Sequence, residues 1–456
     1  MSAAMSDLKR RLIDYALTLD TAALPDEAVR QAKRRIADTI GGAIGAFAAE
    51  PSRIARRLAQ PVAGGPSARV WGSLARTTPE AAAFANGTML RYLDINDTHR
   101  VTDGSHPSDN LGGLVAVAEM LDLSGRDLIL ATVISYEVQC RFVDTVPFND
   151  NGWDQPVPGA MAMALAAGRM LGLSAAAMRD ALALSVIPNL CTYQTRAGEL
   201  SMWKGSAAAN GARNGIFAAR LAAEGMTGPY EAFDGVFGLW KQTLGAPREI
   251  GRLATGEATY AVQQSNIKMY PVRDSCQLPV DTARALRAKV AADRIRSLKI
   301  LTYASAHKGA VADPELWAPQ TRETADHSMP VAVCASLIDG TITPATFDEA
   351  RFLDRDVLDL IGRTEVVVSD DFTRAAPAVR TCRIEATDTD GAVHVAERAL
   401  TAADIERGPD DAALEGKFMA LTRPFLPEPA RRRLYETILA LETVERAARV
   451  VDLTAI

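Results

Sequence analysis

The hydrophobic positions of this chain follow two different periodicities, and the pattern changes near residue 265. From residue 6 to residue 224, apolar side chains recur at three- and four-residue steps, which is typical of amphipathic helices. The pattern predicts Ala- and Leu-rich helices over residues 6–20, 26–47, 80–93, 112–122, 126–145, 158–171, 174–186 and 205–224. Within the second of these helices, Gly41, Gly42 and Gly45 indicate that another helix approaches closely.

Beyond residue 265 the chain shows the alternating, β-branched pattern of strands. Strands are predicted at 295–305, 364–372, 379–391 and 392–400, and helices at 278–291, 328–339, 354–362 and within 409–446. The predicted fold is mostly α with an α+β second domain. We expect a large all-helical domain over residues 1–265, completed by C-terminal helices in 402–456, and a smaller α+β domain over 266–401.

Length and charge narrow the possible functions. A chain of 456 residues exceeds the usual size of a single core, which fits two domains. A net charge of −6 argues against nucleic acid or an anionic membrane as partner, because both require a basic excess. The N-terminus becomes charged at once and no apolar run reaches membrane-spanning length, so we expect a cytoplasmic protein. The five cysteines lie far apart without a C-x-x-C pair, so no disulfide framework is predicted.

One polar segment interrupts the apolar helical pattern. Residues 91–114 read RYLDINDTHRVTDGSHPSDNLGGL and concentrate carboxylates and imidazoles, the groups that most often move protons near neutral pH. Such a cluster is either a solvated loop or a site. His106 has serines and carboxylates close by and is the stronger candidate, whereas we expect His99 and Asp103 at the surface.

Four further segments contain side chains suited to an anionic ligand. They are NGWDQPVPG (151–159), MWKGSAAANGARNG (202–215) with Lys204 and Arg213, NIKMYPVRDSCQ (266–277) with Lys268 and Arg273, and ADHSMP (325–330) with His327. His327 precedes a predicted helix that Ser328 can cap, so either a capping or interface role or a site role is open to it.

The chain lacks the common signatures of metal and cofactor binding. Its histidines and carboxylates match no H-x-x-x-H, H-E-x-x-H or EF-hand spacing. Walker A, G-x-G-x-x-G and G-x-S-x-G motifs are also missing from the sequence. The interpretation we favour is an enzyme that needs neither a metal nor an organic cofactor.

Several of these segments together resemble a known family. RYLDINDT, HPSDNLGG, WKGSAAANGARNG, IKMYP and DHSMPVAV…LIDG are similar, in this order, to signature segments of the MmgE/PrpD family, and the similarity extends from about residue 10 to 440. That family includes 2-methylcitrate dehydratase, cis-aconitate decarboxylase and iminodisuccinate epimerase. The resemblance implies a large helical domain, a smaller α+β domain, a homodimer and a site in the cleft between the domains.

The resemblance also implies site residues. The family's positions fall on Asp94, Thr98, His106, Arg213 and Lys268. The decarboxylase branch has lysine where this chain has Arg213, so arginine there favours the dehydratases. Two departures stand out: Asp154 and Gln155 replace a histidine common in relatives, and Val331 replaces a tyrosine. Both remove proton-transfer groups, which argues against cis-aconitate decarboxylation.

These residues lead to a functional hypothesis. His106, Asp94 and Lys268 are the predicted catalytic residues, with His106 as general acid or base and Asp94 orienting it or sharing the proton transfer. The predicted substrate-binding residues are Thr98, Arg213, Lys204 and Arg273. The hypothesis is a cofactor-independent hydro-lyase of the 2-methylcitrate dehydratase type acting on a small di- or tricarboxylate. Alternatives are an epimerase of an amino- or imino-dicarboxylate, less favourably a cis-aconitate decarboxylase, and a non-catalytic helical scaffold.

Overall fold

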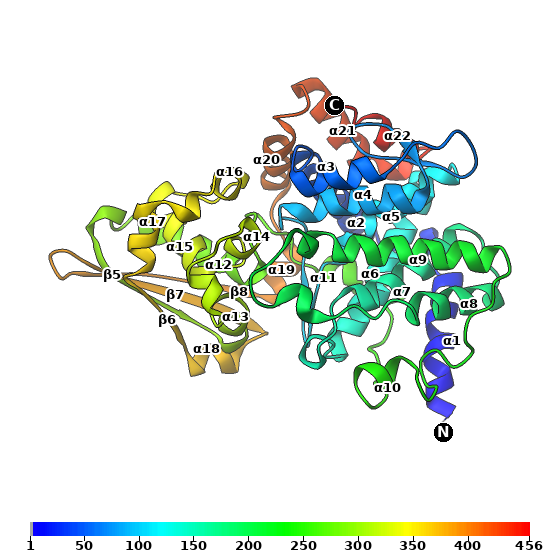
Figure 1. Cartoon of the computed structure of the whole chain (residues 1–456), viewed down its shortest axis with the longest axis horizontal. Helices are drawn as coiled ribbons and strands as arrows, with labels where there is room; N and C mark the ends of the chain where they lie inside the picture. The colour runs from blue at the N-terminus through cyan, green and yellow to red at the C-terminus, as the bar shows by residue number, and fades with distance from the viewer. Residues whose placement is uncertain (1–2) are drawn as a thin grey trace.

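The computed structural model describes the backbone of residues 3–456 and the side chains from residue 7 onward. A helical body forms one end of an elongated molecule and a sheet forms the other (Figure 1). The body contains α1 (Ala3–Thr18), α2 (Asp26–Gly45), α3 (Glu50–Leu58), α4 (Pro79–Tyr92), α5 (Leu111–Met120), α6 (Gly125–Thr145), α7 (Pro156–Met170), α8 (Ala175–Val186), α9 (Ala207–Ala223), α10 (Leu239–Thr243) and α11 (Ala261–Gln264). All eight predicted helices are confirmed, whereas α3, α10 and α11 are additional.

The sheet has four strands in the order β6-β5-β7-β8. They are β5 (Ile295–Thr302), β6 (Thr364–Val368), β7 (Val379–Asp388) and β8 (Val393–Thr401); only β5 and β6 pair in parallel. Along β7, Cys382, Ile384 and Ala386 are buried. The side chains between them, Arg383 and Glu385, pair 2.7 Å apart on the other face. This alternation gives the sheet one packed face and one open face.

Helices from the same part of the chain cover the packed face (Figure 1). Among them, α12 (Asp274–Arg287) packs against β7 and β8. The other helices of this part of the chain are α13 (Ala304–Ala310), α14 (Arg322–Ala325), α15 (Met329–Asp339), α16 (Pro344–Asp348), α17 (Arg355–Ile361), α18 (Asp370–Ala375) and α19 (Ala402–Arg407). The strand predicted over 364–372 ends early, at Val368. Ser369 then accepts a hydrogen bond from the Phe372 amide at 3.4 Å and caps α18, so the polar run SDD begins a helix.

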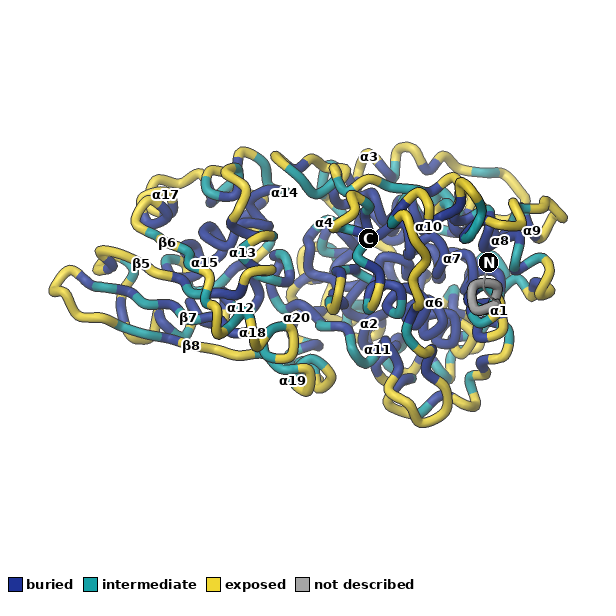
Figure 2. The backbone as a smooth tube through the Cα atoms, turned by 90° about the horizontal axis from the view of Figure 1, so that it is seen from below, coloured by how far each residue is buried: buried dark blue, intermediate teal, exposed yellow. Residues whose placement is uncertain are grey.

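The described residues form two large hydrophobic cores, seen as two buried regions in Figure 2, and two small clusters beside them. The larger core draws on residues 8–262 and 418–451, and the smaller one on residues 270–396. The last helices, α20 (Asp411–Thr422), α21 (Glu428–Leu439) and α22 (Ala448–Asp452), thus return to the helical body. The residue at which one domain passes into the other stays a prediction. None of the helices within residues 3–456 combines the length and the apolar character that crossing a bilayer requires.

Helices α2 and α20 pack at close range. A Cβ atom added at Gly41 would come within 2.8 Å of Phe418 Cδ2, and one at Gly45 within 3.2 Å of the Leu421 carbonyl oxygen. These contacts confirm that the glycines of α2 mark a close helix approach. They also bring the C-terminal α20 against the segments that follow α4.

Lys417, on α20, joins three distant segments at this contact. Its buried Nζ donates to the carboxylate of Asp38 on α2, to the carbonyl of Ile95 at 2.9 Å and to the carbonyl of Lys268 at 2.6 Å. Ile95 and Lys268 each adjoin the polar segments singled out in the sequence. One ammonium group therefore fixes where these two segments meet.

We predict that Lys417→Met lowers the free energy of unfolding by about 3–5 kcal/mol, because Asp38 is left buried without its cation. Urea unfolding of the two proteins measures the difference. Lys308→Met is the matched control, since Lys308 forms an exposed ion pair with Asp150, and its effect should stay within about 1 kcal/mol. Equal effects of the two substitutions would contradict the anchoring role.

Candidate active site

A cavity opens between the helical body and the sheet-bearing part of the chain, and we call it the polar pocket. Its cavity volume is about 50 Å³, which is smaller than the range of about 300–1,000 Å³ typical of small-molecule sites. The residues that line it are Arg91, Asp94, Arg100, Gly104, His106, Asn149, Asp154, Gln155, Tyr193, Arg196, Arg273, Asp274 and His327. The polar segments predicted from the sequence therefore meet in one place.

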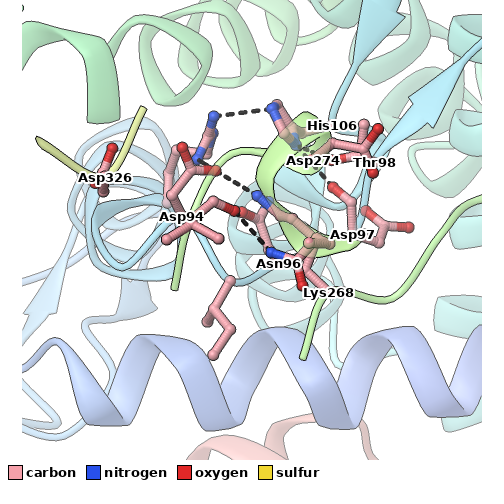
Figure 3. Close-up of polar contacts among 12 residues, drawn as sticks. Asp94, Asn96, Asp97, Thr98, His106, Lys268, Asp274 and Asp326 are labelled. Carbon is pink, nitrogen blue, oxygen red and sulfur yellow. Dashed lines mark hydrogen bonds and ion pairs between the residues drawn. The ribbon is translucent and has the colours of Figure 1, made fainter. Parts of the chain in front are cut away.

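Asp94 lines the polar pocket at its buried end. It follows α4 with a backbone φ of +50°, a left-handed conformation that Asp tolerates better than most residues. Its Oδ1 accepts hydrogen bonds from Arg91 Nη1 at 2.6 Å and from Lys268 Nζ (Figure 3), and Lys204 Nζ lies 3.0 Å from Oδ2. Burial acts to raise the pKa of this carboxyl, but the three cations lower it well below its usual range. Asp94 is therefore an anion at neutral pH.

Lys204 and Lys268 lie behind Asp94 and do not line the pocket. Both are almost completely buried. Burial lowers the pKa of Lys268 to about 8, against the opposing effect of Asp94. Lys204 Nζ also donates to Asp326 Oδ1 at 2.7 Å, so it joins two carboxylates. The two lysines hold Asp94 ionised instead of facing a ligand.

Asp94, Asp326 and His327 have the donor types of a metal site, and their ligand atoms lie within 4.8 Å of one another. Lys204 Nζ already contacts both carboxylates, at 3.0 and 2.7 Å. A metal ion would have to displace this ammonium group, so the residues fit a metal poorly. That the enzyme needs no metal stays a prediction.

His106 is held as a neutral imidazole. Its Nδ1 lies 2.7 Å from the Asp97 carbonyl oxygen, which can only accept a hydrogen bond, so the proton is assigned to Nδ1 (Figure 3). Arg91 Nη2 then donates to Nε2 at 2.8 Å. Burial, followed by the charges of Arg91 and Lys268, lowers the pKa of His106 well below 6.5. Its backbone amide donates to Gln155 Oε1 at 2.6 Å, which fixes the turn.

His327 is a second neutral imidazole on the pocket wall. Its Nδ1 donates to Asp326 Oδ1 at 2.6 Å. Burial, then the nearby charge of Lys204, lowers its pKa to about 3. Ser328 caps α15 by accepting a hydrogen bond from the Val331 amide at 3.1 Å, as predicted, and this places His327 just before the helix. The question left open by the sequence is resolved: Ser328 is the cap, and His327 faces the pocket.

The rest of the wall is rich in arginine. Arg196 lies 3.2 Å from Asp154, and Arg100 lies 3.8 Å from Asp274. The guanidinium of Arg273 donates only to the Gly309 carbonyl and forms no ion pair within the part of the chain that the structure describes. Four arginines and three aspartates line the pocket, and among the described residues no carboxylate is paired with Arg273. The pocket therefore favours an anionic ligand.

Comparison with known proteins shows the family of this chain. Residues 10–249 match the model of the MmgE/PrpD N-terminal domain, and residues 270–443 match that of the MmgE/PrpD C-terminal domain. The chain belongs to the MmgE/PrpD family.

Relatives in this family carry two different activities in their names. Human cis-aconitate decarboxylase is 29% identical over 443 residues, which is 92% of this chain and 89% of that protein. The 2-methylcitrate dehydratase of Cupriavidus necator is 28% identical over 333 residues, 67% of this chain and 66% of that protein. The 2-methylcitrate dehydratase of Escherichia coli K12 is 27% identical over 301 residues, 62% of this chain and 61% of that protein. Similar identities to both groups place the chain in the MmgE/PrpD family without assigning one reaction.

One residue implied by the MmgE/PrpD resemblance lies outside the pocket. Arg213 is exposed on α9, where its guanidinium donates to Asn214 at 3.1 and 3.2 Å. The structure does not bring Arg213 to this pocket, because the buried side of α9 is formed by Ala212 and Ile216. That Arg213 binds the substrate stays a prediction.

Three further expectations change with the structure. Asp94 does not orient His106: the Asp97 carbonyl and Arg91 do. Thr98 lies 3.0 Å from His106 Nδ1 and does not line the pocket, so it supports the imidazole instead of meeting a ligand. His99 and Asp103 are buried and not at the surface. His99 pairs with Asp144 at 2.6 Å, and Asp103 accepts hydrogen bonds from the amides of Gly104 and Asn149.

The two departures from MmgE/PrpD relatives have different surroundings. Gln155 lines the pocket and holds the His106 backbone, so it replaces a proton-transfer side chain by a positioning one. Val331 is completely buried in the smaller core and lies away from the pocket wall. Only the change at Gln155 alters the chemistry of this pocket directly.

Arg91, Asp326 and Asp274 were not predicted as site residues. Arg91 carries a sequence signal, because it ends an alanine-rich helix three residues before Asp94, a spacing at which side chains meet. Asp326 could have been suggested by its place next to His327. Asp274 is paired with Arg380, at 2.9 Å, and nothing in the local sequence indicates that partner.

We predict that His327 makes stability depend on pH. Its folded-state pKa of about 3 lies below the ordinary value of 6.5, so the unfolded chain binds more protons between these values. The free energy of unfolding therefore falls as the pH drops below 6.5, by up to about 1.4 kcal/mol per pH unit from this group. Urea unfolding of wild type and His327→Gln from neutral pH to about pH 5 measures this. The wild type should lose more stability than the variant, and parallel curves would refute the assignment.

Proposed function

We propose that this protein is a hydro-lyase that removes water from a small di- or tricarboxylate, in the manner of the relatives named 2-methylcitrate dehydratase. The observation that carries the proposal is the Asp326–His327 pair. Its imidazole has a proton fixed on Nδ1 and no hydrogen-bond partner at Nε2 among the described residues, and it faces a pocket with an excess of arginine. Such an imidazole is ready to accept a proton.

Dehydration uses these groups as follows. His327 Nε2 takes the proton from a carbon next to a carboxylate, and the electrons of that C–H bond develop negative charge on the carboxylate. Arg273 and Arg91 are placed to offset this charge. The electrons then form the C=C bond, and the neighbouring hydroxyl group leaves as water with a second proton from the pocket. Asp326 stabilises the imidazolium that remains on His327.

In a decarboxylation, the Asp326–His327 pair would have no proton to remove. Loss of carbon dioxide produces a carbanion that must be protonated, so it needs a proton donor and no base. In the empty pocket, both imidazoles are neutral because burial and nearby cations lower the pKa of each. Asp94 is ionised. The protonation state of the empty pocket thus supports proton abstraction over decarboxylation.

Turnover of 2-methylcitrate or citrate tests the proposal. Formation of the conjugated unsaturated acid is followed by its near-ultraviolet absorbance, with purified protein and no added metal. We expect His327→Gln to lower kcat by about 10²–10⁴-fold, because it removes a general base. His307→Gln is the matched control, since His307 lies on α13 outside the pocket. The proposal fails if neither acid is dehydrated or if His327→Gln retains full activity.

A second candidate function is epimerisation of an amino- or imino-dicarboxylate. It is supported by the two imidazoles, His106 and His327, which come from different parts of the chain and line the same pocket. Two such groups can remove a proton from one face of a carbon and return one to the other. This candidate predicts that the α-hydrogen exchanges with deuterated water while no alkene forms, as followed by proton NMR. Alkene formation without exchange would exclude it.

The wider biological setting remains part of the proposal. A homodimer and a place in propionate breakdown rest on the family resemblance alone, and a cytoplasmic location stays the expectation drawn from the sequence.

A further inference from the structure

Arg91 holds two groups of the pocket with one guanidinium. Its Nη1 donates to Asp94 Oδ1 at 2.6 Å and its Nη2 to His106 Nε2 at 2.8 Å. The remaining donor, Nε, lies 3.7 Å from Asp109 and has no hydrogen-bond partner among the described residues. Arg91 is buried at the end of α4, which fixes its position, yet it lines the pocket.

This contact occupies the one lone pair with which His106 could take up a proton. The Nδ1 proton is committed to the Asp97 carbonyl, so proton uptake can occur only at Nε2. Arg91 Nη2 donates to that same atom. In the empty pocket, His106 is therefore blocked as a base and, being neutral, is not an acid at Nε2.

A substrate carboxylate would compete for the same donor. The bond from charged Arg91 to neutral His106 is already charge-assisted, but a carboxylate adds the attraction of an opposite charge and can accept two N–H groups of the guanidinium at once. A carboxylate that draws Arg91 into such a bidentate ion pair pulls Nη2 away from His106, and Nε2 is then free with an anion beside it. We propose that Arg91 blocks His106 in the empty enzyme, and that a substrate carboxylate releases the imidazole, which then takes up a proton from solvent. The inference rests on the proposed function, because it assigns a polycarboxylate to this pocket.

Proton uptake gives the two imidazoles different roles. The protonated His106 supplies the proton that leaves with the hydroxyl group, while neutral His327 takes the proton from carbon. In the reaction, His327 gains one proton and His106 loses one. The C–H and C–O bonds of the substrate break, and one C=C bond and one water molecule form. An acid and a base are thus present together only when substrate is bound.

The charged and titratable groups around His106 bear on this proton uptake. They are Arg91 and Asp94 at the end of α4, Lys268 before α12, Asp109 beside its own turn and His327 across the pocket. Arg91 and Lys268 oppose protonation and Asp94 favours it. A bound carboxylate neutralises part of the positive charge, so it shifts this balance toward the imidazolium.

Calorimetric titration with tricarballylate, a tricarboxylate that has no hydroxyl group to lose, tests the proposal near neutral pH. Repeating the titration in buffers of different ionisation enthalpy gives the number of protons that the protein and ligand take up on binding. His106→Gln corrects for protons that the ligand itself gains, so wild type should take up more protons than this variant. His307→Gln is the matched control, because His307 lies on α13 outside the pocket, and it should take up as many protons as wild type. Equal proton uptake by wild type and His106→Gln, or no binding of tricarballylate, overturns the proposal.

A spectroscopic measurement reports on the same imidazole directly. The chain has five histidines, so histidine labelled with ¹⁵N gives few signals, and His106→Gln identifies that of His106. Tricarballylate should move its Nε2 signal from the neutral to the protonated position, and an unchanged signal in the bound protein refutes the mechanism. The dehydration assay is independent of these measurements. Proton uptake without dehydration contradicts the proposed function but supports the release of His106. Dehydration without proton uptake supports the proposed function but contradicts the release of His106.

Discussion

The charge of Asp94 is the constraint on which the rest of the site depends. An ionised carboxylate that is taken out of water is costly unless cations and hydrogen bonds replace its hydration. Here Arg91 comes from the preceding helix turn, while Lys204 and Lys268 come from segments far along the chain. The need to surround one carboxylate thus joins α4 to two distant segments, and the pocket forms where they meet.

The same constraint explains why the sequence predicts the fold better than the site. The helices of the body were predictable because apolar periodicity is local and survives in a single sequence. The contact between Asp94 and Lys268 spans 174 residues and has no local signature. Arg213 illustrates the opposite case: a charged residue among small ones suggested a ligand, yet the helical period of α9, with Ala212 and Ile216 on its buried side, keeps Arg213 away from this pocket. The burial of His99 depends on Asp144, and hence on tertiary packing.

The protonation states of the two imidazoles bear on how members of the MmgE/PrpD family differ in the reactions that their names give. Relatives named as dehydratases and as decarboxylases match this chain at similar identity, so one scaffold accommodates both kinds of reaction. What must differ between the reactions is where a proton is held when the substrate arrives. In this chain that depends on a few contacts: Asp97 and Arg91 on His106, Asp326 on His327, and Gln155 in place of a side chain that transfers protons.

The position of Lys417 after the two segments that it joins has a consequence for biosynthesis. Ribosomes deliver the N-terminal parts of a chain first, and these begin to fold before the rest is made. The segments around Ile95 and Lys268 emerge well before Lys417, the residue whose ammonium group holds them together. A nascent chain that stops short of α20 leaves the carboxylate of Asp38 without its cation and the two segments without their tie. The contacts that hold the polar pocket together are therefore completed only once residue 417 has been made.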